Sequence, residues 1–510
     1  MSRFYLTTAI DYANGDPHFG HAYEKIGADA IARYRRLRGD AVFFLIGMDE
    51  HGQKVAQTAE ARGLAPQQLA DDVAAAFRAM WERLAISNDV FWRTTDPRHY
   101  AGVQALIERV VAKNPDDLYE KEYEGWYCVG CELFKRESEL VGGQCPIHPT
   151  RTVEWTQERN VFFRLSRYGA FLRRLLERPG FLEPPSRRNE MLALLDQGLE
   201  DISVTRARLT WAIPFPRPLS TGERQGTWVW FDALPNYLTA TGFPAPGYEA
   251  LWPAQLHVIG KDIVRLHTII WPAMLEAAGL PLPERVWGHG WVSFGGERFS
   301  KSAGVKVELA DAVERHGADA FRYFLLREVP WDADGSFTWE RFDERYTADL
   351  ADAFGNLASR VLAMLERYRG GIVPAAGETT ELDRRGEVVF ASYAREMDAL
   401  LLHRAAAAAW ELVSDANVYV DRRAPWTQAK TGDNAGLDVT LAALARALAR
   451  LAVMAHPFMP GAADTLWRAV HGGEAMAPAT AWAHAENPRL EGLRTSRIPP
   501  LFPKPETAAK

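Results

Sequence analysis

Two histidines, His18 and His21, lie three residues apart in the stretch "DPHFGHAYEK" near the N-terminus. Residues with this spacing can share one face at the start of a helix. A zinc site would need further ligands nearby, and the segment offers none with suitable spacing. A turn with Gly and Asn precedes the pair and a helical pattern follows, and at such a junction backbone N–H groups and the helix dipole favour phosphate. The pattern therefore indicates imidazoles that donate to phosphate oxygens, although two ordinary histidines at a helix start fit the same residues.

A second basic element is the stretch "RFSKSAG", in which Lys301 stands between Ser300 and Ser302. Taken alone, a lysine between two serines beside a glycine fits a surface loop. The same residues also fit a basic loop that closes on phosphates, with the lysine as a mobile point charge.

The three cysteines of the chain, Cys128, Cys131 and Cys145, fall within 18 residues, and His148 follows closely. An odd number of cysteines argues against a disulfide framework. The spacings C-x2-C and C-x2-H supply four tetrahedral ligands, and a site closed by four protein ligands is structural. The spacing therefore predicts one structural Zn²⁺ per chain.

Acidic side chains follow an apolar run at residues 42–48, in the stretch "GMDEHG". The run is typical of a strand buried on both faces, and ligands bind at the carboxyl ends of such strands in open α/β sheets. Asp49 there suits a substrate ammonium group. Alternatively, Asp49 or Glu50 could cap the following helix.

The elements that must position these residues follow an α/β pattern at first. A strand at 4–10, a helix at 18–38 and a strand at 42–48 make a βαβ unit, which predicts a parallel sheet with helices on both faces. The α/β pattern continues with a helix at 66–84 and a strand from 89, and a turn-rich β-like insertion begins at about 118. Strands and helices resume at about 227, followed by a hairpin at 286–308. From about 346 we expect helices, up to a proline-rich tail near 498.

The composition is that of a globular protein, with 510 residues, 47% hydrophobic and 25% charged residues, and a net charge of −7. A negative chain is not suited to non-specific nucleic-acid binding, and we expect no DNA partner. No apolar segment reaches the ~18 residues of a membrane span, and the N-terminus does not resemble a signal peptide. We therefore expect a cytoplasmic protein with no membrane partner.

The motifs together resemble those of one family. "PHFGH" is similar to the HIGH signature of class I aminoacyl-tRNA synthetases, and "FSKSAG" is similar to their KMSKS loop. Further stretches resemble the methionyl-tRNA synthetases, in the bacterial form with one zinc knuckle, over nearly the whole chain: "YCVGC", "CPIHP", "RRNEMLALLDQGLEDISVTR", "VWFDALPNYL", "VIGKDIVRLHTIIWPAML" and "FGNLASR".

This resemblance implies a Rossmann-like parallel-sheet catalytic domain with a zinc-bearing insertion, followed by an all-α helical-bundle anticodon-binding domain. It implies activation of L-methionine with ATP and Mg²⁺, transfer to tRNA(Met), and, because the chain stops soon after "LFPKPE", a monomer. The expected ranges are 1–115 and 226–285 for the two catalytic halves, 116–225 for the insertion, 286–345 for the KMSKS-like loop and stem-contact region, and 346–510 for the helical domain and tail.

The resemblance also assigns residues to roles. His18, His21 and Lys301 would be catalytic, and the ATP site would add Gly20, Ser300 and Ser302. The methionine pocket would consist of Ala9, Ile10, Tyr12, Asp49, Trp230, Ala233, Tyr237, Ile263 and His267. The zinc ligands would be Cys128, Cys131, Cys145 and His148, and the anticodon would meet Asn356, Arg360 and Trp426.

Without the resemblance, Trp230 and Tyr237 would be core residues, Trp426 would pack in the helical bundle, and Arg360 would be a surface charge.

The sequence departs from the family pattern at two places. The loop starts with Arg298-Phe299 instead of Lys-Met, and Met48 stands where the family usually has Thr. Two rival interpretations follow from the same motifs. One is another HIGH-bearing synthetase, for cysteine, leucine, isoleucine or valine; the other is a catalytically silent relative that binds tRNA.

Replacing Lys301 by Ala should slow methionyl-adenylate formation far more than it weakens methionine binding. The lysine would act on charge that develops as pyrophosphate leaves, so its effect belongs to the transition state. We expect a loss of about 10²-fold or more in the rate of ATP–pyrophosphate exchange. An unchanged exchange rate would mean that the altered loop takes no part in the reaction.

Overall fold

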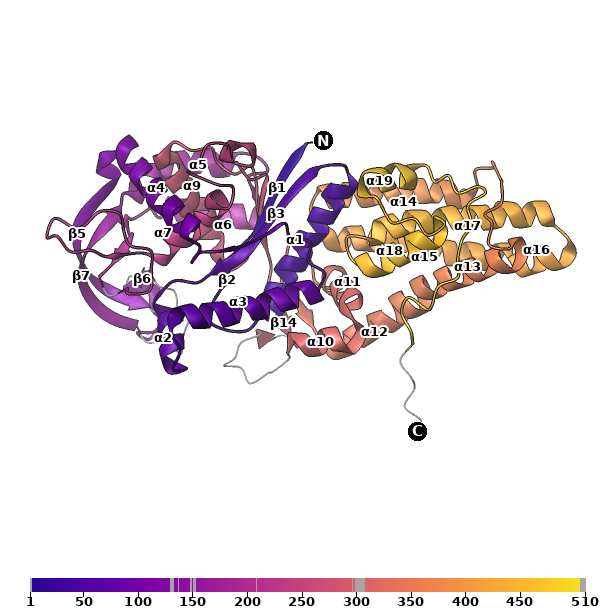
Figure 1. The fold of residues 1–510 in the computed structure, drawn as a ribbon, viewed down its shortest axis with the longest axis horizontal. Coiled ribbons are helices and arrows are strands. Elements are labelled where there is room, and N and C mark those ends of the chain that lie inside the picture. The colour runs from indigo at the N-terminus through magenta and orange to yellow at the C-terminus, as the bar shows by residue number, and fades with distance from the viewer. Residues whose placement is uncertain are drawn as a thin grey trace.

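The computed structural model describes residues 2–128, 133–135, 137–146, 149, 153–207, 209–295, 297–298 and 308–504. A sheet-containing part and a helical part lie side by side, with helix α1 (Phe19–Leu37) between them (Figure 1). The predicted helix at 18–38 is confirmed to within one residue at each end.

The main sheet is parallel throughout, as predicted from the βαβ pattern. Its strand order is β3–β1–β12–β13–β8, and β2 and β4 both pair with β3. The strands are β1 (Arg3–Thr8), β2 (Asp11–Tyr12), β3 (Ala41–Asp49), β4 (Val90–Arg93), β8 (Leu182–Glu183), β12 (Leu256–Gly260) and β13 (Val286–His289).

Both faces of the sheet are covered by apolar side chains, because neighbouring residues of a strand point to opposite faces. Leu6 and Phe44 belong to one core, and Tyr5 and Leu45 belong to the other. The first core continues without a break into the helical part. The helices that flank the sheet are α1, α2 (Gln53–Ala61), α3 (Pro66–Arg83), α4 (Pro97–Lys113), α5 (Gly169–Glu177), α6 (Pro185–Asp196), α7 (Val229–Ala233), α8 (Asn236–Thr239) and α9 (Trp271–Ala278).

The segment from Leu118 forms a separate antiparallel sheet of order β6–β5–β7–β9. Strands β5 (Leu118–Cys128) and β7 (Val153–Phe163) pair along their whole length, and β6 (Leu133–Lys135) and β9 (Ile202–Ser203) flank them. Between β7 and β9 the chain visits the main sheet, where β8 pairs with β13.

The hairpin expected at 286–308 is only partly right. Strand β13 pairs in parallel with β12 and is part of the main sheet. Among the described residues of this stretch, β14 (Val292–Phe294) and β15 (Glu297–Arg298) are antiparallel to each other, and β14 also pairs in parallel with β16 (Gly335–Phe337). The buried register of β13 against β12 determines its place, which a local turn pattern does not reveal.

Helices make up most of the described chain from 346 to 486, as expected. Helix α12 (Trp339–Arg345) continues through Tyr346–Gly355 into α13 (Asn356–Arg369). The C-terminal tail packs against this long helix, where the Tyr346 hydroxyl donates to the Pro503 carbonyl oxygen at 2.7 Å. The other helices are α10 (Leu309–His316), α11 (Ala318–Glu328), α14 (Glu381–Asp398), α15 (Leu402–Arg423), α16 (Pro425–Thr431), α17 (Asn434–Ala455), α18 (Pro460–Val470) and α19 (Pro478–Glu486). Within the described part of the chain, no helix combines the length and apolar character of a membrane span.

A buried guanidinium joins the two parts. Arg322 on α11 contacts the Asp29 carboxylate of α1 at 2.6 Å, and neither side chain is exposed. It also donates to the carbonyl oxygens of Leu84, Pro457 and Phe458. Burial alone would raise the pKa of Asp29, but Arg33 and Arg322 outweigh burial and hold that pKa below its ordinary value.

Replacing Arg322 by Leu should therefore destabilise the protein, because Asp29 and three carbonyl groups lose a buried partner. The expected cost is about 3–5 kcal/mol, measured as a lower thermal midpoint in calorimetry. The control is Arg395→Leu, which removes an arginine that is 69% exposed and should change stability by less than about 0.5 kcal/mol. Equal shifts in the two variants would contradict the role given to Arg322.

Candidate active site

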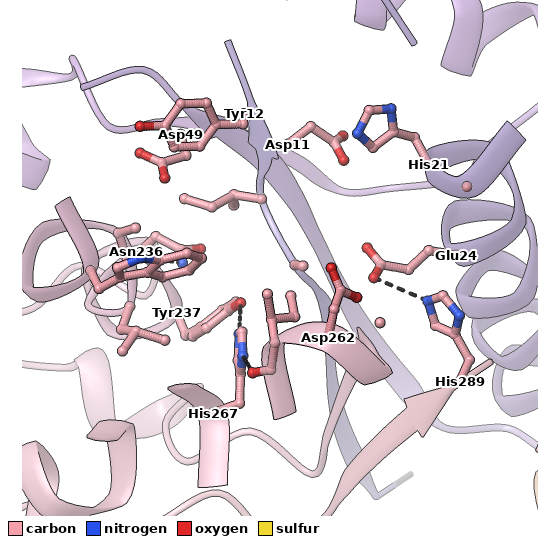
Figure 2. Close-up of a pocket in the computed structure, with 18 of the residues that line it drawn as sticks. Asp11, Tyr12, His21, Glu24, Asp49, Asn236, Tyr237, Asp262, His267 and His289 are labelled. Carbon is pink, nitrogen blue, oxygen red and sulfur yellow. Dashed lines mark hydrogen bonds and ion pairs between the residues drawn. The ribbon is translucent and has the colours of Figure 1, made fainter. Parts of the chain in front are cut away.

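A cavity of about 300 Å³ lies at the carboxyl ends of the central strands of the main sheet (Figure 2). Residues at or just beyond the carboxyl ends of β1, β3 and β12 line it, together with the start of α1 and the short helix α7. Because parallel strands end at the same edge, segments far apart in the sequence meet there. The volume is at the lower end of the range for small-molecule sites.

The histidine pair lies at the wall of this cavity. His18 is the residue before the first turn of α1, and its Nδ1 accepts from the Gly20 N–H at 3.1 Å. His21 Nδ1 accepts from the His18 N–H at 3.3 Å, and the two rings stack with centroids 3.7 Å apart. A Cβ on Gly20 would lie 3.0 Å from the His18 ring. The glycine therefore lets the ring fold over the helix start.

These contacts determine which ring nitrogens carry protons. A nitrogen that accepts from a backbone N–H carries no proton, so each neutral ring has its proton on Nε2. Burial, then the neighbouring His18 and Lys25, lower the pKa of His21 well below 6.5. His21 is therefore neutral at pH 7 and able to donate one hydrogen bond through Nε2.

All nine residues expected for the methionine pocket line the same cavity. Tyr237 also belongs to the apolar core, so this residue is both a core residue and part of the cavity wall. His267 Nδ1 donates to the Ile263 carbonyl oxygen at 2.9 Å, and its Nε2 accepts from the Tyr237 hydroxyl at 2.7 Å. Burial lowers the pKa of His267 to about 4, so this ring is also neutral.

The two carboxylates of the acidic motif at the end of β3, those of Asp49 and Glu50, lie in different surroundings. Asp49 lines the cavity. Glu50 turns away from it and accepts from Arg93 Nε at 2.5 Å and from the Thr95 hydroxyl, and burial raises the pKa of Glu50. The expectation that Asp49 or Glu50 caps the next helix is wrong, because α2 begins after Gly52, with no side-chain cap. Gly52 takes a φ of 112°, which a glycine adopts readily.

Sequence reasoning missed several residues that also line the cavity: Asp11, Glu24, Asp262, His289 and Trp291. Asp262 and His289 stand at the carboxyl ends of β12 and β13. The rule that pointed to Asp49 would also have found these two. Glu24 lies one turn beyond His21 on α1, so helical spacing could have indicated it.

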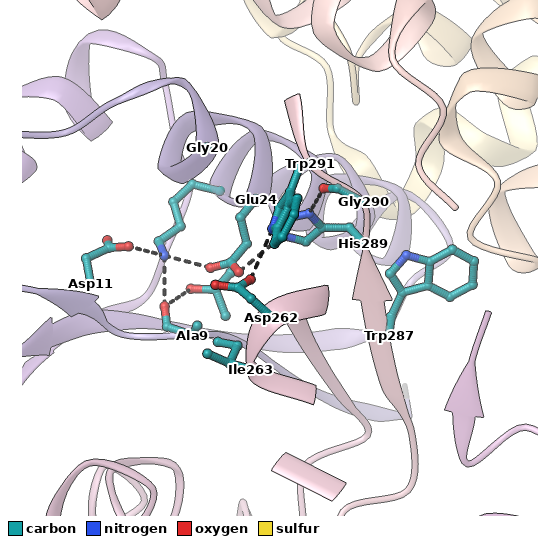
Figure 3. A network of polar contacts seen from close by, with 12 residues as sticks. Ala9, Asp11, Gly20, Glu24, Asp262, Ile263, Trp287, His289, Gly290 and Trp291 are labelled. Atoms are coloured by element: carbon teal, nitrogen blue, oxygen red, sulfur yellow. Dashed lines mark hydrogen bonds and ion pairs between the residues drawn. The ribbon is translucent and has the colours of Figure 1, made fainter. Parts of the chain in front are cut away.

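A buried lysine connects three of the missed residues. Lys25 Nζ contacts the Ala9 carbonyl oxygen at 2.8 Å, Asp11 Oδ1 at 2.7 Å and Glu24 Oε1 at 2.9 Å. The other oxygen of Glu24 lies 3.2 Å from His289 Nε2 (Figure 3). Burial raises the pKa of Asp11 to about 7, against the lowering effect of Lys25.

The residues expected for the KMSKS-like loop, the zinc site and the anticodon lie outside this cavity or outside the described residues. Ser300, Lys301 and Ser302 lie outside the described residues, as do Cys131 and His148. Cys128 and Cys145 are both buried. In the helical part Asn356 is exposed, Arg360 is ion-paired with Asp421 at 2.9 Å, and Trp426 is 46% exposed. The expectation that Trp426 packs in the bundle is therefore wrong, and Arg360 is a partly exposed charge.

The neutral state of His267 predicts a pH dependence of stability. Its pKa is 6.5 when exposed and about 4 in the fold, so between these values the unfolded chain binds a proton that the folded chain does not. Stability is therefore lost as the pH falls through this window. In His267→Gln the decrease in unfolding free energy from pH 7 to pH 5 should be smaller by about 2 kcal/mol. Denaturant titrations of both proteins check this, and parallel pH curves would contradict it.

Family models and relatives agree on one assignment. The model for class I tRNA synthetases (M) matches residues 4–153 and 147–362, and the model for the anticodon binding domain of methionyl tRNA ligase matches residues 373–501. A methionine–tRNA ligase of Caldanaerobacter subterraneus subsp. tengcongensis is 42% identical over 98% of this chain and 78% of its own. A methionine–tRNA ligase of Streptomyces coelicolor is 39% identical over 99% of this chain and 97% of its own.

Solved structures agree with this. Methionyl-tRNA synthetase of Mycobacterium tuberculosis in complex with methionyl-adenylate is 38% identical, with a TM-score of 0.92, over 99% of this chain and all of that one. The similarity thus extends through both the parallel-sheet part and the helical part. This chain belongs to the methionyl-tRNA synthetases, a family of class I aminoacyl-tRNA synthetases.

Proposed function

We propose that the cavity at the carboxyl edge of the main sheet is where this chain carries out the methionine–tRNA ligase reaction. In the first step the methionine carboxylate attacks the α-phosphate of ATP, and pyrophosphate leaves. In the second step the methionyl group passes from the adenylate to the 2′-hydroxyl of the terminal adenosine of tRNA, and AMP leaves. Mg²⁺ enters as part of the substrate, coordinated by ATP phosphate oxygens.

One observation supports this more than any other. All nine residues that the family motifs assign to methionine, and three that they assign to ATP, line a single cavity. They come from segments between Ala9 and His267, and the topology of the sheet alone brings them together. The catalytically silent relative and the rival amino acids remain as outcomes of the tests below.

The phosphates of ATP would lie at the start of α1. His18 and His21 present Nε2–H groups there, beside the positive end of the helix dipole. Neutral donors fixed in advance stabilise charge that develops in the transition state without reorganising. Gly20 would line the same site, and Lys301, with Ser300 and Ser302, would bind the leaving pyrophosphate.

Methionine would lie at the other end of the cavity. Asp49 would accept hydrogen bonds from its ammonium group, and its thioether would contact the aromatic rings of Tyr12, Trp230 and Tyr237. Sulfur–aromatic contacts are favourable. The aliphatic and imidazole groups that complete this wall belong to Ala9, Ile10, Ala233, Ile263 and His267.

The helical part would read the CAU anticodon through Asn356, Arg360 and Trp426. An indole face can stack on an unpaired base, and amide and guanidinium groups can reach base edges. The 46% exposure of Trp426 supports this role, because a fully packed ring could not stack on RNA.

Replacing Trp426 by Ala should separate the two steps of the reaction. Stacking of a base on an aromatic ring is worth ~1–3 kcal/mol, so tRNA charging should fall at least several-fold. ATP–pyrophosphate exchange with methionine, which needs no tRNA, should barely change. The control is Val388→Ala, an exposed apolar residue on α14, which should leave both activities intact. If both activities fall together in the Trp426 variant, the anticodon assignment is wrong.

The insertion would hold one Zn²⁺ through Cys128, Cys131, Cys145 and His148. Two of these thiols are buried, as expected for soft ligands of a structural metal. The ion supplies folding free energy when bound, and the chemistry at the cavity does not use it. We further propose the five ranges given from the sequence as domains, a monomer, and a cytoplasmic location.

Metal analysis of the purified protein should find about one zinc per chain. Cys128→Ser should lower the thermal midpoint, while the folded fraction keeps its exchange activity, because the ion would have no open coordination position for water. A metal-free protein with full stability and activity would overturn the zinc site.

A further inference from the structure

Three buried side chains form a polar cluster behind the cavity wall, and no role has yet been given to them. Asp232 Oδ2 lies 2.7 Å from His51 Nδ1, and Asp232 Oδ1 lies 2.9 Å from His99 Nε2. None of the three side chains is exposed. His51 belongs to the "GMDEHG" motif. The roles expected for that motif concern its two carboxylates and leave His51 without a role.

The hydrogen bonds of this cluster define a protonation state. Trp92 Nε1–H donates to His99 Nδ1 at 3.3 Å, so His99 carries its proton on Nε2 and donates it to Asp232. His51 Nδ1 donates to the other oxygen, and His51 Nε2 meets the Tyr100 hydroxyl at 2.8 Å. Burial alone would raise the pKa of Asp232, but His51 and His99 outweigh burial and lower it. Asp232 is therefore an ionised carboxylate held by two imidazole N–H groups.

The position of Asp232 connects this cluster to the substrate. It lies on α7, a helix of five residues, between Trp230 and Ala233, which line the cavity. A helix this short closes almost no internal hydrogen bonds, so its orientation depends on contacts with its surroundings. His51 follows the cavity residue Asp49 by two positions. One carboxylate thus joins the two walls between which methionine would bind.

We propose that Asp232, held by His51 and His99, is a positioning residue for the amino-acid substrate: it fixes the rotation of α7 so that Trp230 and Ala233 face the side chain of methionine. The inference rests on the proposed function. The His51–Asp232–His99 cluster contributes to KM for methionine, because its carboxylate lies on α7, between two residues of the expected methionine pocket.

The test compares Asp232→Asn and Asp232→Ala with wild type in ATP–pyrophosphate exchange. We expect KM for methionine to rise at least about 10-fold in Asp232→Ala and less in Asp232→Asn, with KM for ATP within about twofold of wild type. Asp117→Asn is the matched control, since Asp117 is also fully buried and hydrogen-bonded, to Arg167 and Tyr168, but lies outside the cluster. It should lower stability without changing KM for methionine.

A spectroscopic readout separates positioning from general stability. In Asp232→Asn the amide oxygen should face His99, which Trp92 fixes as a donor, and the amide N–H should face His51. His51 must then carry its proton on Nε2 and donate to Tyr100, whereas His99 keeps its state. Long-range ¹H–¹⁵N spectra of the histidines report this exchange of tautomer directly.

The outcomes are distinguishable. If wild type shows no methionine-dependent exchange, the proposed function fails. If wild type is active but KM for methionine is unchanged in the Asp232 variants, the inference is overturned. It is also overturned if KM for methionine and KM for ATP rise equally, if only the fraction of active sites falls in an active-site titration, or if His51 keeps its tautomer in Asp232→Asn.

Discussion

The ammonium group of Lys25 contacts three oxygen atoms and has no exposed surface. Two of the three belong to carboxylates, those of Asp11 and Glu24. An isolated buried charge is costly, and removing one partner of a buried pair is more damaging than never having had the pair. The cavity can therefore hold two acids in its wall only because one cation lies beneath them. The second oxygen of Glu24 contacts His289, which connects α1 to β13. Helix α1 also carries the histidine pair at its first turn.

Hydrogen bonds define the tautomers of the histidines at and behind the cavity wall. His18 and His21 accept through Nδ1 and present Nε2–H, whereas His267 donates through Nδ1 and accepts through Nε2. His99 carries its proton on Nε2 because an indole N–H occupies its other nitrogen. Each tautomer is imposed by a hydrogen bond to a backbone or aromatic group. Preorganised donors of this kind lower a barrier without the cost of reorienting solvent.

Sequence periodicity predicted the first βαβ unit closely because its helix and strands bury continuous apolar faces. The signature motifs selected His18, His21 and nine further residues that all line one cavity. The Lys25 contacts could not be predicted in the same way. Adjacent opposite charges at Glu24 and Lys25 normally indicate a solvated helix face. Here Lys25 contacts Ala9 and Asp11 beyond β1, and Glu24 contacts His289 on β13, more than 250 residues later in the chain. The helix cap expected at Asp49 or Glu50 was wrong because Gly52 stands at the N-cap position of α2, and the Glu50 carboxylate accepts from Arg93 instead.

We infer that this cavity selects methionine and activates it. The decisive experiment is ATP–pyrophosphate exchange, measured with purified protein and with each standard amino acid in turn. We expect exchange with methionine and, at comparable concentrations, with no other amino acid. Exchange that depends on cysteine, leucine, isoleucine or valine, or no exchange with any amino acid, would contradict it.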